Sequence, residues 1–262
     1  MKQAILGYLP PNHPWREHIQ IHEVLSSTNT HAKELARLGA PEGTVVIAGH
    51  QTAGRGRLGR SFHSPKGQGL YLSLVLRPDC SPAELMHLTC AVGVAACDAV
   101  ETAAGIRPGI KWINDLTLGH KKLGGILVEL GMGTSGLVDY AVIGIGINCR
   151  AEALPRELDG LACSLSDFDS EPDVSSLAAE LILALEQMER QLLTNRSAIM
   201  DRYRRDCVTV GSQVRVISPS GTETGLAECV NDDGSLTVLF RDGQRRQVNS
   251  GEVSVRGLWD YL

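Results

Sequence analysis

The sequence lacks the features that would mark a membrane or secreted protein. Its 262 residues contain no apolar stretch close to the roughly 20 residues of a membrane span. The short apolar run after Lys2 is broken by Pro10 and Pro11, so it is too short for the core of a signal peptide. We therefore expect a cytoplasmic protein that has no contact with a membrane.

Closely spaced cysteines are also missing. The seven cysteines are dispersed, and no two of them have the C-x-x-C spacing of zinc sites or thioredoxin-like redox sites. An odd and dispersed set is typical of reduced thiols in the core of a cytosolic protein.

The sequence has no excess of basic residues. Its formal net charge is -5 and its pI is about 5.9. Because affinity for nucleic acid comes from a basic face, these values argue against DNA or RNA as the main partner. Local basic clusters can still bind a small anion. The length is sufficient for one large domain and a small one.

Apolar periodicity predicts alternating strands and helices in the first 207 residues. Ser26 to Asn29 suits a helix N-cap, Gly39 suits a helix end, and Ser81 to Glu84 has a capping-box pattern. An interruption is expected near Thr194-Asn195. The predicted helices cover residues 30–38, Pro82 to about Gly105, and 175–204, and the predicted strands cover 19–25, 43–48, 70–76, 109–113, 123–130 and 138–147.

The pattern changes after Cys207. Residues 208–258 contain short alternating strands separated by turns at 219–221, 231–234 and 241–243. This pattern predicts a small all-β barrel of about 50 residues. The sequence therefore divides into a domain over residues 1–207 and a second domain over residues 208–262.

A loop rich in arginine and glycine follows the strand predicted at 43–48. Gly54, Gly56 and Gly59 fit the G-x-G-x-x-G pattern, and Asp79 stands at the distance of a ribose-binding carboxylate. A dinucleotide site, however, needs a helix that begins at the loop. Residues 60–69 contain a proline and two glycines and lead into a strand, so we reject the dinucleotide interpretation. The Walker A pattern does not occur in the sequence.

The side chains of this loop suit an anion. Arg55, Arg57 and Arg60 place fork-shaped donors on a flexible segment that repels itself until an anion neutralises it. A solvated basic turn is the alternative explanation for such a run of charge.

A second group of polar residues surrounds the next predicted hairpin. Lys111-Trp112-Ile113-Asn114-Asp115 ends one strand, and Lys121-Lys122 begins another. Each group alone is better explained by a simple turn or by a solvated lysine than by a binding site. Together with the arginine loop they indicate a phosphate-binding ligase or transferase.

At this point the sequence resembles a known family, the biotin protein ligases. The resemblance is strong over about residues 20–150 and looser through the C-terminal barrel, where Ser250 to Ser254 is also similar. The segments that carry it, in the family's order and spacing, are Ser27-Thr28-Asn29, Gln51 to Arg60, Lys111 to Asp115, Lys122 to Leu127, and Gly144 to Asn148.

The resemblance implies an α+β fold and a two-step reaction. The fold would be a mixed central sheet with flanking helices, like the class II synthetase-like catalytic domain of biotin and lipoate ligases, followed by a small C-terminal SH3-like β-barrel. The enzyme would use ATP, Mg²⁺ and biotin to form biotinyl-5′-AMP and release pyrophosphate. It would then transfer biotin to one lysine of the biotin carboxyl carrier protein of acetyl-CoA carboxylase and release AMP.

The resemblance also implies the site residues. The implied catalytic residues are Lys122, Arg57 and Asp115. The implied biotin-binding residues are Ser27, Thr28, Asn29, Gln51, Arg55, Gly56, Arg57, Lys122 and Gly125. The implied ATP- and adenylate-binding residues are Arg55, Arg57, Arg60, Phe62, Lys122 and Asn148. No protein ligand for a metal is assigned, because Mg²⁺ is expected to come with ATP.

The sequence departs from the family pattern at two positions and leaves alternatives open. Ile113 stands where proline is common, and Phe62 stands where tryptophan is common. Only about eighteen residues precede the first predicted strand, too few for the DNA-binding domain of the relatives that repress transcription. The alternatives are a lipoate–protein ligase, a biotin-sensing transcriptional regulator and a binding module without catalysis. We expect a monomer or a homodimer.

Overall fold

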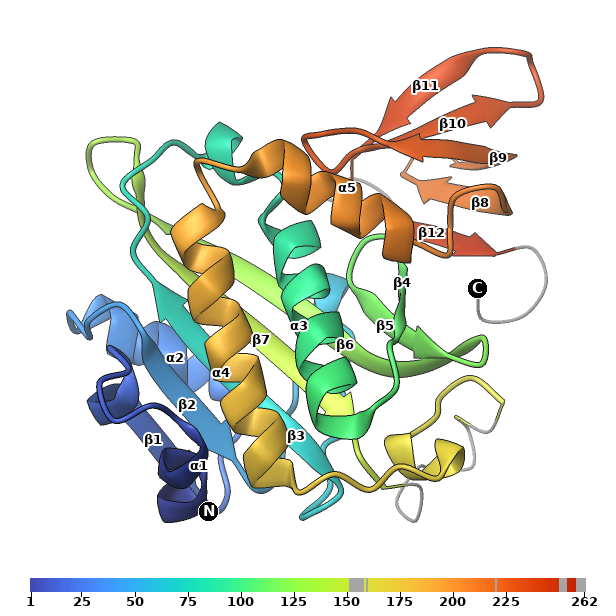
Figure 1. Ribbon diagram of the computed structural model, residues 1–262. Helices are drawn as coiled ribbons and strands as arrows, with labels where there is room; N and C mark the ends of the chain where they lie inside the picture. Colours follow the sequence, from blue (N-terminus) through green and yellow to red (C-terminus); the bar gives the residue numbers. More distant parts are fainter. Residues whose placement is uncertain (151–157, 159, 220, 250–253, 258–262) are drawn as a thin grey trace.

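The computed structural model describes residues 1–150, 158, 160–219, 221–249 and 254–257 (Figure 1). The helices are α1 (Lys2–Tyr8), α2 (Thr28–Arg37), α3 (Leu88–Ala104), α4 (Val174–Gln191) and α5 (Arg196–Asp206), with 3-10 turns η1 (Arg16–His18), η2 (Arg57–Gly59), η3 (Pro82–Leu85) and η6 (Leu165–Phe168). The strands of the larger sheet are β1 (Ile19–His22), β2 (Thr44–Ala48), β3 (Gly69–Leu76), β4 (Gly109–Lys111), β5 (Asp115–Leu118), β6 (Lys121–Met132) and β7 (Val138–Asn148). The smaller sheet contains β8 (Gln213–Ser218), β9 (Gly221–Val230), β10 (Leu236–Phe240), β11 (Arg245–Val248) and β12 (Ser254–Gly257).

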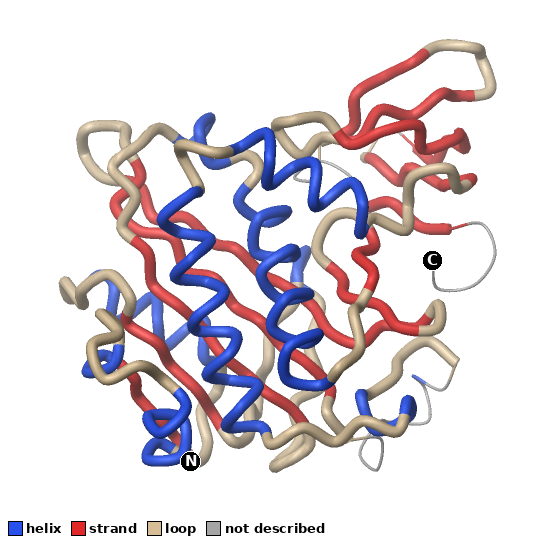
Figure 2. The backbone as a smooth tube through the Cα atoms, in the orientation of Figure 1, coloured by secondary structure: helices blue, strands red, loops and turns tan. Residues whose placement is uncertain are grey.

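The larger sheet has the order β1-β2-β3-β7-β6-β5-β4. β1 and β2 pair in parallel, and the other neighbours pair antiparallel, which confirms the predicted mixed sheet. Helices α3 and α4 cover one face, and α2 packs on the opposite face (Figures 1 and 2). Because β3 and β7 are central and covered on both sides, their sequences are almost continuously apolar.

Successive residues of β2 show how the two layers form. Val45 and Ile47 belong to the main core, which also contains the apolar residues of α3 and α4, whereas Val46 belongs to a separate cluster with Ala32 and Ala36 of α2. This alternation follows from the two-residue repeat of a strand. The face that carries α2 is also the face on which the largest described group of polar side chains lines a cavity.

The predicted helix signals are confirmed. Ser27 caps α2 by accepting a hydrogen bond from the Thr30 amide, and Gly105 ends α3 in the left-handed conformation that glycine favours. The capping box of Ser81 and Glu84 is present, but it opens the 3-10 turn η3 before α3 begins. The break between α4 and α5 falls where the sequence places it.

One helical stretch has the length and composition of a membrane span, contrary to the sequence expectation. It covers Pro82–Ala104, and 72% of its most apolar window is buried inside the protein. Small residues let this stretch pack closely against α4 and the sheet. Its apolar character therefore follows from its position in the core.

The smaller sheet is antiparallel and has the order β11-β10-β9-β8-β12, consistent with an SH3-like fold. It contacts the larger domain through Trp112, whose indole N–H donates to the Gly234 carbonyl at 2.9 Å and whose amide donates to Thr209 Oγ1 at 2.8 Å. We propose that the domain boundary follows Cys207, between the end of α5 and the start of β8.

Three sequence expectations differ from the structure. Helix α1 was not predicted, β1 ends at His22, and β4 ends at Lys111 rather than at residue 113. Trp112 and Ile113 are buried in the turn after β4, and their peptide bond is cis. Their apolar side chains continue the strand pattern although the backbone has left the sheet. Residues 220, 250–253 and 258–262 of the predicted barrel lie outside the described residues.

Candidate active site

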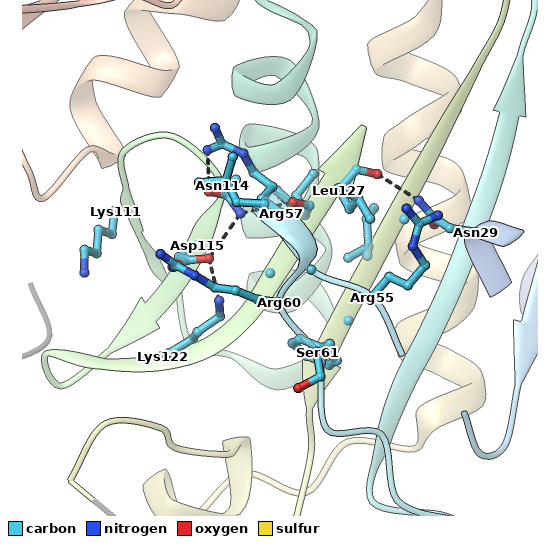
Figure 3. Close-up of a pocket in the computed structure, with 18 of the residues that line it drawn as sticks. Asn29, Arg55, Arg57, Arg60, Ser61, Lys111, Asn114, Asp115, Lys122 and Leu127 are labelled. Atoms are coloured by element: carbon cyan, nitrogen blue, oxygen red, sulfur yellow. Dashed lines mark hydrogen bonds and ion pairs between the residues drawn. The ribbon is translucent and has the colours of Figure 1, made fainter. Parts of the chain in front are cut away.

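A cavity of about 480 Å³ opens on the α2 side of the larger sheet. Its walls come from the start of α2, the loop at residues 54–62, the β5–β6 hairpin and β7, and Arg215 of β8 reaches it from the second domain. Figure 3 shows that Arg57 and Arg60 of the loop and Lys122 of the hairpin come from separate segments to the space around Asp115, whereas Arg55 points toward Asn29. The predicted site residues that line the cavity are Ser27, Thr28, Asn29, Gln51, Arg55, Gly56, Arg57, Arg60, Phe62, Asp115, Lys122 and Gly125.

The start of α2 forms one end of the cavity. Ser27 and Thr28 are buried, and the amide and hydroxyl of Thr28 donate to Gln51 Oε1 at 2.8 and 3.0 Å. Gln51 Nε2 in turn donates to Ser64 Oγ at 2.8 Å. Capping of α2 by Ser27 leaves its hydroxyl hydrogen able to donate to a ligand. This end therefore offers hydrogen-bond donors inside a buried setting.

Asn29 also lines this end of the cavity, and hydrogen bonds to three other residues hold its side chain. Its Nδ2 donates to the Leu127 carbonyl at 3.3 Å and to Glu129 Oε2 at 3.1 Å, and its Oδ1 accepts from Ser73 Oγ at 2.6 Å. Ser73 is fully buried in the middle of β3. Sequence reasoning missed this residue, although a single serine inside an apolar strand was a usable signal.

The arginine and glycine loop closes on itself as a hairpin. The Gly56 amide donates to the Arg60 carbonyl at 2.7 Å, and the Phe62 amide donates to the Gly54 carbonyl at 2.9 Å. A Cβ at Gly54 would lie 2.3 Å from the Phe62 carbonyl oxygen, so the closed hairpin requires glycine there. The backbone itself thus holds the loop beside the cavity.

Arg55 points toward the α2 end of the cavity. Its guanidinium lies 3.2 Å from Glu129, which also receives Lys33 Nζ at 2.7 Å. Burial opposes ionisation of Glu129, but hydrogen bonds from Lys33 and Asn29 outweigh it and hold the pKa of this carboxylate below its usual value. Glu129 was also missed by sequence reasoning.

The opposite end of the cavity is cationic. Lys122 Nζ lies 2.6 Å from Asp115 Oδ1, and Asn114 Nδ2 donates to the same oxygen at 3.2 Å. Arg57 donates to Asn114 Oδ1 at 3.0 Å. Burial lowers the pKa of Arg57, and the nearby Asp115 opposes that shift, so the guanidinium stays charged. This arrangement brings two cations, one carboxylate and one amide together at one place.

Two glycines of β7 make room for the side chains above them. A Cβ at Gly144 would lie 1.9 Å from Asn29 Oδ1, and a Cβ at Gly146 would lie 2.5 Å from the Phe62 ring. In the structure, the space above both residues is occupied by the side chains that shape the cavity wall.

One predicted residue lies elsewhere, and several wall residues were not predicted. Asn148 is absent from the described cavity wall, and its Nδ2 donates to the Cys163 carbonyl at 3.0 Å. The wall residues that were not assigned to the site include Lys111, Trp112, Asn114 and Arg215. The first three belong to the noted Lys111 to Asp115 segment. Arg215 is an ordinary alternating position of β8 in sequence and gave no signal.

Comparisons with known proteins agree with this geometry. Residues 21–148 match the model of the biotin/lipoate A/B protein ligase family, and residues 209–256 match that of the biotin protein ligase C-terminal domain. The chain is 37% identical over 234 residues to the bifunctional ligase/repressor BirA of Bacillus subtilis, covering 88% of this chain and 72% of that protein. It is 34% identical over 248 residues to the biotin–[acetyl-CoA-carboxylase] ligase of Mycobacterium tuberculosis, covering 91% and 89%.

Solved structures show the same similarity. The biotin protein ligase of Aquifex aeolicus in complex with biotin and ATP matches with a TM-score of 0.78 at 26% identity, covering 91% of this chain and 98% of that chain. The Leishmania major biotin protein ligase in complex with biotinyl-5-AMP matches with a TM-score of 0.61 at 25% identity, covering 92% and 100%.

Proposed function

The chain belongs to the biotin/lipoate A/B protein ligase family and is a biotin ligase, and from this premise we propose the full reaction and the role of each residue. The enzyme joins biotin to ATP as biotinyl-5′-AMP and then transfers biotin to a lysine of a biotin carboxyl carrier protein. The observation that carries the proposal is the cavity itself, in which buried donors lie at one end and Lys122, Arg57 and Asp115 lie at the other.

The donor end binds the ureido ring of biotin. The ureido carbonyl accepts hydrogen bonds from the Ser27 hydroxyl and from the N–H of Gln51 that Ser64 does not use. Ile126, Leu127 and Ile145 of the cavity wall contact the apolar part of the ring and the valeryl chain. Carbonyl recognition by buried donors gives selectivity, because a ligand without the carbonyl would leave these groups unpaired.

The cationic end carries out the first step. An oxygen of the biotin carboxylate attacks the α-phosphorus of ATP, and the bond from that phosphorus to the pyrophosphate oxygen breaks. Negative charge develops on the α-phosphate and on the departing pyrophosphate, and Lys122, Arg57 and Arg60 lie where they stabilise it. Asp115 and Asn114 are oxygen donors of the kind that Mg²⁺ takes alongside phosphate, and the ion would lower the charge of the nucleotide.

The second step needs a neutral amine. The carrier lysine has an ordinary pKa near 10.4, so it arrives protonated at neutral pH. Asp115 orients the amine and takes its proton, and the nitrogen then attacks the acyl carbon of the adenylate. The amide bond forms, the bond from the acyl carbon to the phosphate oxygen breaks, and AMP leaves, while the second proton of the attacking nitrogen passes to the departing phosphate. The closed loop excludes water from the labile anhydride.

The test is direct biotinylation. We expect the purified chain, with biotin, ATP and Mg²⁺, to add one biotin to an isolated carrier domain, as seen by intact mass spectrometry, and to leave a lysine-to-arginine carrier unmodified. Pyrophosphate–ATP exchange should depend on biotin and not on lipoate. Exchange with lipoate but not with biotin, or a carrier that stays unmodified in the presence of active exchange, would overturn the proposal.

A further inference from the structure

A continuous set of polar contacts, buried around Ser73 and partly exposed toward its ends, lies beneath the donor end of the cavity. It begins at the Phe62 carbonyl, which accepts from Ser64 Oγ at 3.0 Å, and it ends at Arg55, so both ends lie on the arginine and glycine loop. The residues between these ends are, in order, Ser64, Gln51, Thr28, Ser73, Asn29 and Glu129.

Protein partners occupy both N–H donors of the Asn29 side chain. A carboxamide has two N–H donors, and those of Asn29 face the Leu127 carbonyl and the Glu129 carboxylate, neither of which can donate. The orientation of the amide is therefore fixed, with Oδ1 toward the Ser73 hydroxyl. No N–H of this side chain is left for a ligand, although Asn29 lines the cavity. Its contribution is the shape of the wall.

Two residues hold Asn29 in that orientation without lining the cavity themselves. Neither Ser73 nor Glu129 belongs to the described cavity wall, and Ser73 is 0% exposed. Glu129 also binds Lys33 of α2 and Arg55 of the loop, so a single carboxylate ties the helix to the start of the loop. Because Glu129 is anionic at neutral pH, these contacts exist before any ligand arrives.

We propose that Ser73 and Glu129 are positioning residues for biotin activation, which act by orienting Asn29 and by holding Arg55 and the start of the loop beside the biotin ring. The inference rests on the proposed placement of biotin between α2 and the loop. Since these residues shape the binding end and touch no reacting atom, their loss weakens biotin binding and leaves the chemical step and ATP binding unchanged.

The first experiment measures biotin-dependent pyrophosphate–ATP exchange in two variants and one control. Ser73→Ala removes one buried hydroxyl, and Glu129→Gln removes the charge that holds Arg55 and Lys33. Each should raise the KM for biotin about tenfold, as expected for the loss of one buried hydrogen-bond partner, while kcat and the KM for ATP stay within about twofold. The control is Asp139→Asn, which removes a different ion pair, between Asp139 of β7 and Arg77 after β3. It should change neither kcat nor the KM for biotin or ATP.

A charge exchange tests whether Glu129 acts through Asn29. Asn29→Asp places two carboxylates against each other, so its KM for biotin should rise more than that of Glu129→Gln. In the double variant Asn29→Asp/Glu129→Gln, the new glutamine donates to the new aspartate, and the KM for biotin should fall below that of Asn29→Asp alone. A purely structural effect would instead add the two losses.

The results distinguish a failure of this inference from a failure of the proposed function. An unchanged KM for biotin in both Ser73→Ala and Glu129→Gln overturns the inference, as does an equal loss in kcat and both KM values, or a double variant that is worse than Asn29→Asp. Should Ser73→Ala fail to fold, the partly buried Glu129 and the charge exchange decide the question. A wild-type chain that shows no biotin-dependent exchange would refute the proposed function instead.

Discussion

Lys122→Ala should abolish most of the first half-reaction while leaving the fold intact. The ammonium group lies 2.6 Å from Asp115, at the end of the cavity where Arg57 is also fixed. Removing one such charge from a transition state that gains phosphate charge costs about 2.7–4 kcal/mol, or about 10²–10³ in rate. The ion pair itself is part-exposed, with side-chain exposures of 29% for Lys122 and 19% for Asp115, so its loss should lower the free energy of unfolding by less than about 1 kcal/mol.

The assay is biotin-dependent pyrophosphate–ATP exchange, which reports the first step without a carrier. The loss should fall on kcat and on kcat/KM to a similar extent, because the charge develops only in the transition state. Thermal unfolding, measured on the same samples, should show a midpoint close to that of the wild type.

Lys121→Ala is the matched control, because it removes the same charge one residue earlier in β6. Lys121 is exposed and is not among the described residues of the cavity wall. We expect near wild-type exchange from this variant. The assignment of Lys122 would be refuted by exchange within a fewfold of wild type in Lys122→Ala, or by an equal loss in Lys121→Ala, which would point to overall charge rather than to position.

Three further predictions follow from the same geometry. Asp115→Asn should slow transfer of biotin from preformed biotinyl-AMP to the carrier by about 10²-fold or more, as expected for the loss of a general base, and single-turnover transfer at the wild-type rate would contradict this. Gly146→Ala should displace the Phe62 ring, since the new Cβ would lie 2.5 Å from it; we expect a cost of about 1–3 kcal/mol in stability and a higher KM for ATP, and an unchanged KM would remove Phe62 from the nucleotide site. Asp206 is nearly buried, and hydrogen bonds from Arg107 and Arg205 overcome the opposing effect of burial and lower its pKa. A lowered folded-state pKa stabilises the protein above the ordinary aspartate pKa of about 3.9, and this stabilisation is lost as the pH falls through the folded-state value. Asp206→Asn should therefore reduce the free energy of unfolding by about 1–3 kcal/mol at neutral pH. In urea titrations the difference in unfolding free energy between wild type and variant should narrow below about pH 4, and a difference that stays constant with pH would count against the role of this carboxylate.

Local chemistry made most of the fold predictable. The cap at Ser27, the left-handed Gly105 and the break before α5 are set by residues within a few positions of each other, so the sequence contains all the information they need. The apolar runs of β3 and β7 predicted buried central strands for the same reason. The segment after β4 was misassigned because Trp112 and Ile113 are buried outside the sheet, Trp112 against the second domain and Ile113 beside Tyr203 of α5. Periodicity cannot distinguish such burial from burial in a strand.

The site was predictable only where its residues stand in short motifs. Most of the residues that the resemblance implied do line one cavity, although their roles stay predictions. Glu129 and Asn29, by contrast, stand 100 residues apart in sequence and meet because α2 packs over β3 and β7, and β6 lies next to β7 in the sheet. No periodicity relates such a pair, and a glutamate on a strand is ordinarily solvent-facing. Arg215 was missed for the same reason, since only the docking of the second sheet brings it to the cavity.

The glycines of the arginine loop show how a shared pattern can arise from different physical needs. In a dinucleotide site the glycines let a helix begin against a pyrophosphate. Here Gly54 permits the Phe62 carbonyl to approach, and Gly59 adopts a φ of +74° at the hairpin tip. Both serve closure of a hairpin, and the chain continues into β3 rather than into a helix. The loop offers no helix N-terminus to an anion, so in the proposed function the phosphate contacts come from arginine side chains, which a dinucleotide loop does not need.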